Sequence, residues 1–276
     1  MNILLLGDIM GSSGRECVLT HLPNIIKKKK LDFVIVNGEN AAVQGVGLTE
    51  QICRDFFNCG VNVITTGNHV WDRKEIMQFI DKEKRLLRPL NLFEPSPGSG
   101  FNIYDAKGDI KIGVLNLMGN IFMKKCEDVF QATKNFLKKY KLKEDYDLLV
   151  VDFHGEITSE KNAIGHLFDG QATLVVGTHT HIPTNDARIL EKGTAYQTDA
   201  GMCGDYDSVI GGDKNAWIEK FLDDTYYKKI ETSSKGIALC GAIIKICDKT
   251  GLSSIVKQLI LGDTIENKIP NEKIFL

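Results

Sequence analysis

The stretch Ile3-Leu4-Leu5-Leu6-Gly7-Asp8 places an aspartate directly after a short apolar run. A run of this length that ends in glycine is typical of a buried strand. Ser12-Ser13 can then cap a helix that runs toward Lys27-Lys28-Lys29-Lys30, and Phe33-Val34-Ile35-Val36 forms the next apolar run. The sequence therefore predicts a β-α-β unit with Asp8 at the carboxyl end of its first strand.

The same alternation continues along the chain. Thr49 can cap a helix that ends near Cys59. Apolar periodicity predicts further helices at 71–80, 127–140 and 159–167, and strands at 61–64, 101–104, 110–117, 148–153 and 173–176. Residues 89–100 are predicted to be a proline-rich loop. Two hairpins are predicted, one joining 188–190 to 194–197 and the other joining 237–247 to 252–261 through a turn at 248–251. Parallel units are thus followed by antiparallel pairs. This order indicates one α/β domain over residues 1–276, with two mixed sheets packed face to face between helices.

Polar side chains that can bind metals follow the carboxyl ends of these strands, where ligands of layered sheets collect. They are Asp8, Glu39, Asn40, Asn68, His69, His154, His179 and His181. Carboxylate and amide oxygens and imidazole nitrogens suit divalent Mn, Fe, Zn or Mg. The pattern predicts a centre for two metal ions, and hence a metallohydrolase. The other two histidines, His21 and His166, lie in helix-like stretches, and we interpret them as structural or surface residues.

Each patch also has a purely structural interpretation when it is taken alone. Asp8 can cap a helix, Glu39-Asn40 can be solvated loop residues, and Gly67-Asn68-His69 has the composition of a turn. His179 and His181 are stronger candidates, because alternate residues of an extended backbone share one side. The occurrence of every patch after a strand favours the metal centre.

The composition limits the classes of partner and location. The chain has 276 residues, 43% of them hydrophobic, and a net charge of -2, so it lacks the basic field that binds duplex nucleic acid. We expect no membrane segment and no signal sequence, since no window reaches ~18 apolar residues. The seven cysteines form no CxxC pair, which indicates reduced, buried thiols in the cytoplasm. The sequence leaves the oligomeric state open, and a homo-oligomer is one option.

Five motifs, in order, resemble those of the calcineurin-like metallophosphoesterases, and more narrowly those of their YmdB-like bacterial branch. They are Gly7-Asp8, Asn37-Gly38-Glu39-Asn40-Ala41, Thr66-Gly67-Asn68-His69-x-Trp71-Asp72, Asp152-Phe153-His154-Gly155-Glu156 and Val176-Gly177-Thr178-His179-Thr180-His181. The likeness extends from Met1 to about Leu261 and includes Thr198-Asp199-Ala200-Gly201-Met202. It implies a four-layer α/β/β/α sandwich, a dinuclear metal centre and hydrolysis of phosphodiesters, with 2',3'-cyclic nucleotides as the substrate class.

The chain departs from the wider superfamily at two motifs. The usual Asp-x-His is Asp8-Ile9-Met10, and the usual Gly-Asp-x-x-Asp is Asn37-Gly38-Glu39-Asn40. Both changes are shared with the YmdB-like branch. The resemblance therefore implies that Glu39 bridges the metals in place of an aspartate and that Asn40 takes the place of the imidazole missing at Met10.

The resemblance implies two ligand sets that share Glu39. The first metal would be held by Asp8, Glu39, Asn40 and His181. The second would be held by Glu39, Asn68, His154 and His179. Two divalent ions and two carboxylates keep a charge of about +2, which can bind a phosphoryl oxygen and acidify a bridging water, so that hydroxide attacks phosphorus. Fe and Mn are the ions we expect first, with Zn or Mg as alternatives.

His69 belongs to neither ligand set. Imidazole suits protonation of a departing alkoxide near neutral pH, so we expect His69 to be the general acid, the alternatives being a third ligand or a structural histidine. Glu156 and Asp199 are expected to orient imidazole N–H groups. The glycine-rich segment 201–212 could hold a nucleobase against Tyr206, or it could be a surface turn.

The leading hypothesis for function is a phosphodiesterase with a small phosphodiester substrate, such as a cyclic nucleotide. A phosphomonoesterase such as a nucleotidase is the near alternative. A metal-containing regulatory or RNA-associated protein is an alternative of a different class.

Overall fold

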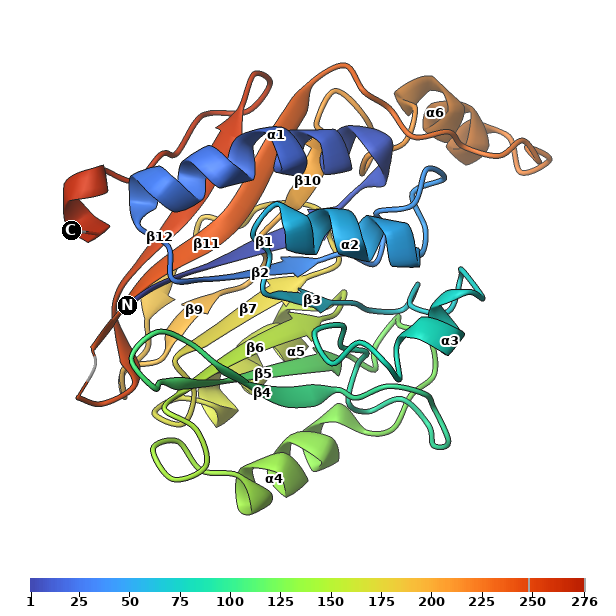
Figure 1. The fold of residues 1–276 in the computed structure, drawn as a ribbon. Helices are drawn as coiled ribbons and strands as arrows, with labels where there is room; N and C mark the ends of the chain where they lie inside the picture. The colour runs from blue at the N-terminus through green and yellow to red at the C-terminus, as the bar shows by residue number, and fades with distance from the viewer. Residues whose placement is uncertain (248, 276) are drawn as a thin grey trace.

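A computed structural model describes residues 1–247 and 249–275, and it holds two six-stranded sheets (Figure 1). The first has the order β12-β11-β10-β1-β2-β3 and the second the order β4-β5-β6-β7-β9-β8. Strands of the first sheet are β1 (Asn2–Ile9), β2 (Phe33–Asn37), β3 (Val63–Thr65), β10 (Met202–Asp205), β11 (Ile237–Cys247) and β12 (Leu252–Gly262). Strands of the second sheet are β4 (Phe101–Asp105), β5 (Lys111–Met118), β6 (Leu148–His154), β7 (Leu174–Thr178), β8 (Arg188–Ile189) and β9 (Ala195–Gln197).

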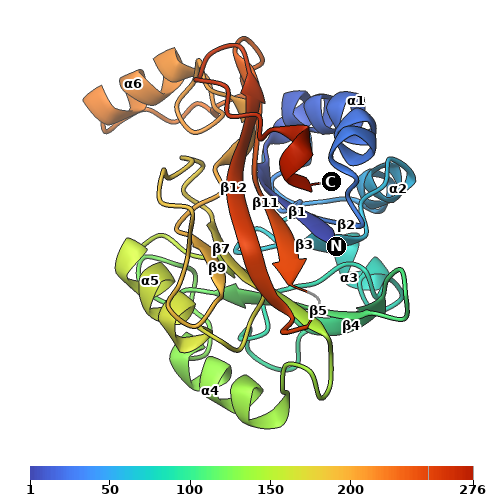
Figure 2. The same ribbon diagram turned by 90° about the vertical axis from the view of Figure 1, so that its left-hand side faces the viewer.

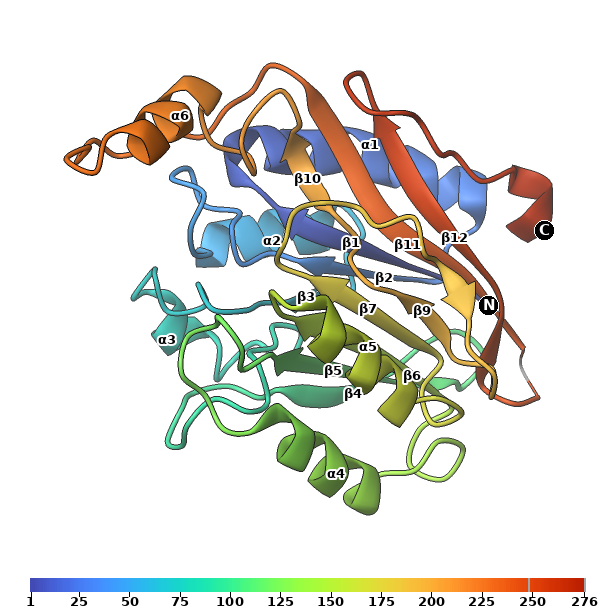
Figure 3. The same ribbon diagram turned by 180° about the vertical axis from the view of Figure 1, so that it is seen from behind.

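Helices cover the outer face of each sheet, as Figures 1 and 3 show. The first sheet carries α1 (Gly11–Lys29) and α2 (Glu50–Asn58), and the second carries α4 (Val129–Lys139) and α5 (Thr158–Leu167). The remaining helical segments are α3 (Ile76–Phe79), α6 (Lys214–Leu222) and a 3-10 turn (Glu272–Phe275).

Three apolar layers hold these elements together, and the alternation of side chains along β1 explains two of them. Leu4 and Leu6 point outward into the cluster under α1 and α2. Ile3 and Leu5 point inward and pack with Val150 of β6. A third cluster lies between the second sheet and α4 and α5. Because strands buried on both faces need apolar residues on both, this packing explains the continuous apolar runs. The expected four-layer α/β/β/α sandwich is confirmed; a single domain over residues 1–276 stays a prediction.

Strand β1 occupies the middle of the first sheet. It pairs in parallel with β2 and β10 and antiparallel with β11. In the second sheet, β5, β6 and β7 are parallel to one another. Both predicted hairpins form. Strand β8 pairs with β9, and β11 pairs with β12, as Figure 2 shows for the second pair. Asp248, in the predicted turn of the second hairpin, lies outside the described residues.

The caps of the first two helices differ from each other. The Thr49 side chain accepts a hydrogen bond from the Ile52 backbone at 3.3 Å, which confirms the predicted cap of α2. The cap predicted at Ser12-Ser13 is wrong, since both lie inside α1, which follows Met10 without a side-chain cap. Instead, the first backbone N–H of α1, from Gly11, donates to the Asn40 carbonyl at 2.9 Å. A contact distant in sequence thus replaces the local cap.

The predicted helix over 71–80 is mostly wrong. Only Ile76–Phe79 is helical, and the preceding residues form turns, with Asp72 N–H bonded to the His69 carbonyl and Ile76 N–H to the Arg73 carbonyl. Bonds between residues three apart make tight turns rather than an α-helix. These turns keep His69 at the surface of the site described below.

Two elements near the C-terminal third were not predicted. Met202–Asp205, expected as loop, is strand β10, which pairs with β1 at Asp8 and Ile9. Helix α6 has no buried residue and projects from the body of the molecule in all three views. Its sequence shows little apolar periodicity, so a pattern search misses it.

The predicted burial of the cysteines is confirmed for four of the seven residues. Cys17, Cys53, Cys203 and Cys240 are buried, while the other three are half-buried. Burial raises the pKa of the Cys17 thiol to about 11. Among the described residues, no helix combines the length and apolarity that a membrane crossing requires.

We predict that Leu5→Ala lowers the free energy of unfolding by about 3 kcal/mol, because the lost side chain leaves a cavity between the two sheets. Leu5 is fully buried. Urea unfolding of the purified variant measures this loss. Leu222→Ala is the matched control, since Leu222 is 83% exposed and should stay within about 0.5 kcal/mol of the parent. Equal losses in both variants would contradict the assignment of the inner core.

Candidate metal centre

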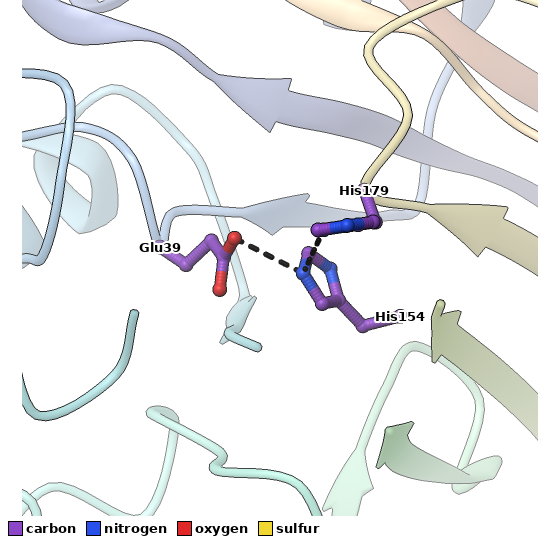
Figure 4. Close-up of side chains that lie close together, drawn as sticks. All are labelled: Glu39, His154 and His179. Atoms are coloured by element: carbon purple, nitrogen blue, oxygen red, sulfur yellow. Dashed lines mark hydrogen bonds and ion pairs between the residues drawn. The ribbon is translucent and has the colours of Figure 1, made fainter. Parts of the chain in front are cut away.

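Side chains from four separate strands meet where the carboxyl ends of both sheets come together. Asp8 lies near the end of β1, Glu39 follows β2, His154 ends β6 and His179 follows β7. Figure 4 shows Glu39, His154 and His179 turned toward one another, and one donor atom of each lies within 4.8 Å of the others. The Asp8 carboxylate accepts a hydrogen bond from the His179 backbone at 2.9 Å. The structure therefore brings together residues up to 171 positions apart.

Hydrogen bonds on the outer side of two imidazoles decide which nitrogen faces the centre. The Thr178 hydroxyl donates to Asp152 at 2.7 Å, so toward His154 Nδ1, at 2.9 Å, it can only accept. Nδ1 of His181 lies 2.9 Å from the Ile210 carbonyl, which also can only accept. Both rings therefore hold a proton on Nδ1 and turn Nε2 inward, which is the nitrogen that a metal ion would bind once any proton on it is displaced.

The third imidazole, that of His179, also turns one nitrogen toward the cluster, but this nitrogen is Nδ1 rather than Nε2. Nε2 of His179 lies 3.1 Å from the Glu156 carboxylate, so Glu156 lies beside an imidazole, as expected. Nδ1 of His179 then faces Nε2 of His154 at 3.1 Å. The oxygens of Asn68 and Glu39 each lie 3.0 Å from that same Nε2. Four electron-rich atoms this close repel one another unless they share a positive charge, either a proton or a cation.

Two buried oxygens beside this cluster show that the residues fit a metal ion. Oδ1 of Asp8 and Oδ1 of Asn40 have no hydrogen-bond partner within residues 1–247 and 249–275. A buried polar atom without a partner costs about 1–3 kcal/mol, a cost that metal coordination removes. Asn40 also lies beside His181, with 3.2 Å between its amide nitrogen and Nε2. The donor atoms thus fall into one group around His154 and another around Asn40 and His181.

The charges of the cluster are strongly coupled. Burial alone would raise the pKa of Glu39, but the neighbouring His154 imidazole lowers it to about 2. Burial opposes charge on His154 as well, yet Glu39 and Asp8 raise its pKa to about 9. Burial raises the pKa of Asp8 to about 6. Burial and the adjacent His154 lower the pKa of His179 to about 3, which keeps that ring neutral. The carboxylates therefore favour positive charge at His154 Nε2.

The backbone that carries His179 and His181 is strained. Their φ angles are 101° and 66°, in the left-handed region that residues other than glycine rarely adopt. Asp199 holds the loop between them by accepting from the backbone N–H of Thr180 at 3.1 Å and from its hydroxyl at 2.8 Å. Lys161, buried to 1% exposure, donates to Asp199 at 2.5 Å. The expectation that Asp199 orients an imidazole is therefore wrong; it orients the loop.

His69 stands at the exposed edge of the cluster. Its backbone N–H donates to Glu39 at 3.0 Å, and its Nδ1 lies 2.7 Å from the Asp72 carboxylate. Asp72 also binds Lys124 at 3.1 Å. The side chain of His69 is 29% exposed, so it reaches both the cluster and the solvent side. The other two histidines, His21 and His166, are exposed on α1 and α5.

A cavity of about 460 Å³ opens directly onto the cluster. Its lining includes His69 and Trp217, and the sequence pattern did not single out Trp217. Tyr206, expected as a stacking surface, does not line this cavity. Its hydroxyl donates to the His181 carbonyl at 3.1 Å and accepts from the Met202 N–H at 2.9 Å, so it supports the backbone instead. Only the fold could distinguish these two aromatic residues, because neither lies in a strand or helix with a clear pattern.

Comparison with known proteins identifies close relatives. A model of the YmdB-like protein family matches residues 4–259. The chain is 41% identical over 263 residues to the 2',3'-cyclic-nucleotide 2'-phosphodiesterase of Bacillus subtilis, covering 95% of this chain and 98% of the relative. The crystal structure of a hypothetical protein from Thermus thermophilus superposes with a TM-score of 0.87, at 36% identity, and covers 95% of this chain and 100% of that one. A structure described as a novel phosphatase from Mycoplasma pneumoniae has a TM-score of 0.87, at 34% identity, with 95% and 93% coverage.

We predict that metal binding to the metal-free protein releases about one proton per protein at pH 7. A pKa of about 9 means that His154 is protonated at this pH, and a metal ion must displace that proton. Because the competing proton is bound below pH 9, metal affinity should rise from pH 6 to pH 9. Calorimetry in buffers of different ionisation enthalpy measures the release. His21→Ala should release as many protons as the parent, whereas no release at pH 7 in either protein would contradict the coupling.

We predict that Lys161→Met lowers the free energy of unfolding by about 3–5 kcal/mol, because it leaves the buried Asp199 carboxylate without its cation. Urea unfolding of metal-free protein measures the change. The double variant Lys161→Met, Asp199→Asn should recover part of the loss, since it removes the unpaired charge. A single variant within about 1 kcal/mol of the parent would show that the pair does not support the loop.

Proposed function

Because the chain belongs to the YmdB-like family, we propose that it is a metal-dependent phosphodiesterase that hydrolyses 2',3'-cyclic nucleotides. One observation carries the proposal: three imidazoles turn one ring nitrogen toward the same cluster, while an oxygen acceptor of the protein lies beside the other ring nitrogen. The name of the Bacillus subtilis relative supports the substrate class. The 460 Å³ cavity is in the size range of small-molecule sites, which supports a small substrate rather than a polymer.

The proposed centre would hold two divalent ions, with Glu39 in both ligand sets. Asp8, Glu39, Asn40 and His181 would form one ligand set. Glu39, Asn68, His154 and His179 would form the other. The grouping of donors around His154 and around Asn40 and His181 supports this division. Fe and Mn are the proposed ions, because both accept mixed nitrogen and oxygen donors.

The residues of the protein would hold the metal ions, orient the loop that carries His179 and protonate the leaving group. When bound, divalent ions supply positive charge that stabilises the phosphoryl oxygens and acidifies water. The carboxylate of Asp72 accepts the Nδ1 proton of His69, which leaves Nε2 to carry the proton that the departing alkoxide takes. Asp199 and Lys161 hold the loop that carries His179 in the position in which its imidazole faces the cluster.

A phosphomonoesterase is the nearest alternative. The Mycoplasma pneumoniae relative that is described as a phosphatase supports this alternative. Assays of a 2',3'-cyclic nucleotide, a bis-aryl phosphate and an aryl monophosphate side by side separate the two. The proposed diesterase should turn over the first two much faster than the third. A cytoplasmic location is also proposed, in keeping with the scattered, mostly buried thiols.

We predict that His69→Gln retains both metal ions and loses at least 100-fold in kcat, because glutamine cannot transfer the proton that an imidazole supplies. Elemental analysis and turnover of a 2',3'-cyclic nucleotide measure the two effects. Parental turnover in this variant would overturn the role of His69.

His179→Ala provides the contrast, since it removes an inward-facing nitrogen and should lose metal and activity together. Retention of full metal content in this variant would contradict the ligand sets. Two results together would instead indicate a regulatory role. The parent protein would hydrolyse no cyclic nucleotide, and an inactive variant such as His179→Ala would still restore the function of the parent in the cell.

A further inference from the structure

The cavity beside the metal centre is lined by two kinds of side chain. Glu39, Asn40 and His179 of the cluster are polar, whereas Met10, Ile210, Trp217 and others are apolar. A phosphodiester group needs only the polar side chains. The apolar side chains therefore suit whatever group is attached to the phosphate.

The apolar wall is assembled from segments far apart in the chain, and glycines let them approach. A Cβ at Gly45 would lie 2.6 Å from the Met10 side chain. A Cβ at Gly212 would lie 2.6 Å from Nε1 of Trp217 and 2.9 Å from Ile230. Both contacts are shorter than van der Waals distance, so these positions accept only glycine without rearrangement. The close packing holds Trp217 at the cavity although α6, which carries it, has no buried residue.

Trp217 is held in orientation by its own helix. The Phe221 ring stacks on it, with ring centroids 5.6 Å apart and an angle of 26° between the planes. Lys220 reaches over the indole, with Nζ 4.9 Å from its centroid. Lys220 is exposed, so its flexible side chain can move aside for a ligand. The indole is thus packed against Phe221, while its contact with Lys220 can be exchanged for one with a ligand.

We propose that Trp217 and Ile230 bind the nucleobase of the substrate, so that the chain distinguishes nucleotides from other phosphodiesters. The inference rests on the proposed function and adds the residues that select the substrate. A planar base suits an aromatic wall, and stacking on an aromatic side chain is sequence-tolerant because every base has a π-face. Gln44, which also lines the cavity and has no hydrogen-bond partner among the described residues, offers an amide to the edge of the base.

A comparison of two substrates tests the proposal. One is adenosine 2',3'-cyclic phosphate, and the other is methyl ribofuranoside 2',3'-cyclic phosphate, which lacks the base. Trp217→Ala should lower kcat/KM for the nucleotide at least 10-fold, mainly through KM, and change the base-free substrate less than 2-fold. Trp217→Phe should restore most of the loss, because a phenyl ring still stacks. Leu222→Ala, on the same helix but outside the cavity, should match the parent on both substrates.

Binding measured without turnover separates this inference from the proposed function. The chain has two tryptophans, so Trp217 is the only indole in the Trp71→Phe variant. Adenosine monophosphate should quench its fluorescence in a saturable manner, whereas ribose 5-phosphate should not. Quenching without hydrolysis of any cyclic phosphate would sink the proposed activity but retain the base site. Equal losses on both substrates in Trp217→Ala, or no quenching by the nucleotide, would overturn the base site even if the enzyme is a phosphodiesterase.

Discussion

The hydrogen bond from the His179 backbone to the Asp8 carboxylate joins the two sheets at the point where their strands end. It requires β1 of one sheet and β7 of the other to deliver their carboxyl ends to one place. The inner apolar layer makes this possible, because Ile3 and Leu5 pack against the facing strands of the second sheet. The proposed centre therefore depends on how the sheets pack, and a shift of one sheet against the other would separate its donors.

The same junction concentrates electron-rich atoms that would repel one another in the absence of positive charge. Glu39 and Asp8 raise the pKa of His154, and the oxygens of Thr178 and Glu156 lie beside the ring nitrogens that face away from the cluster. Such an arrangement costs stability, as buried polar networks do when they are incomplete. The cost is a sign of function, because a structural core would place apolar residues there.

The backbone of the loop that carries His179 and His181 is strained, and this strain also costs stability. Positive φ angles at both residues are unfavourable by themselves, and the buried pair of Lys161 and Asp199 provides the contacts that hold them. Ligand loops on a rigid scaffold are typical of sites that must keep their geometry. The aromatic residue of the cavity, Trp217, is held instead by glycine contacts and by its own helix.

Local pattern was sufficient to predict much of this protein. The apolar run ending at Asp8, the spacing of His179 and His181, and the cap at Thr49 each depend on neighbours in sequence, so the strands, the hairpins and the candidate donors could be predicted from it. The helix expected over 71–80 failed because turns that place His69 beside Glu39 replace it. Met202–Asp205 became a strand through pairing with β1, and the choice between Tyr206 and Trp217 as the cavity aromatic was made by packing. The order of residues determines which groups are available, whereas the tautomers, the coupled pKa values and the shared cavity arise only from contacts between distant segments.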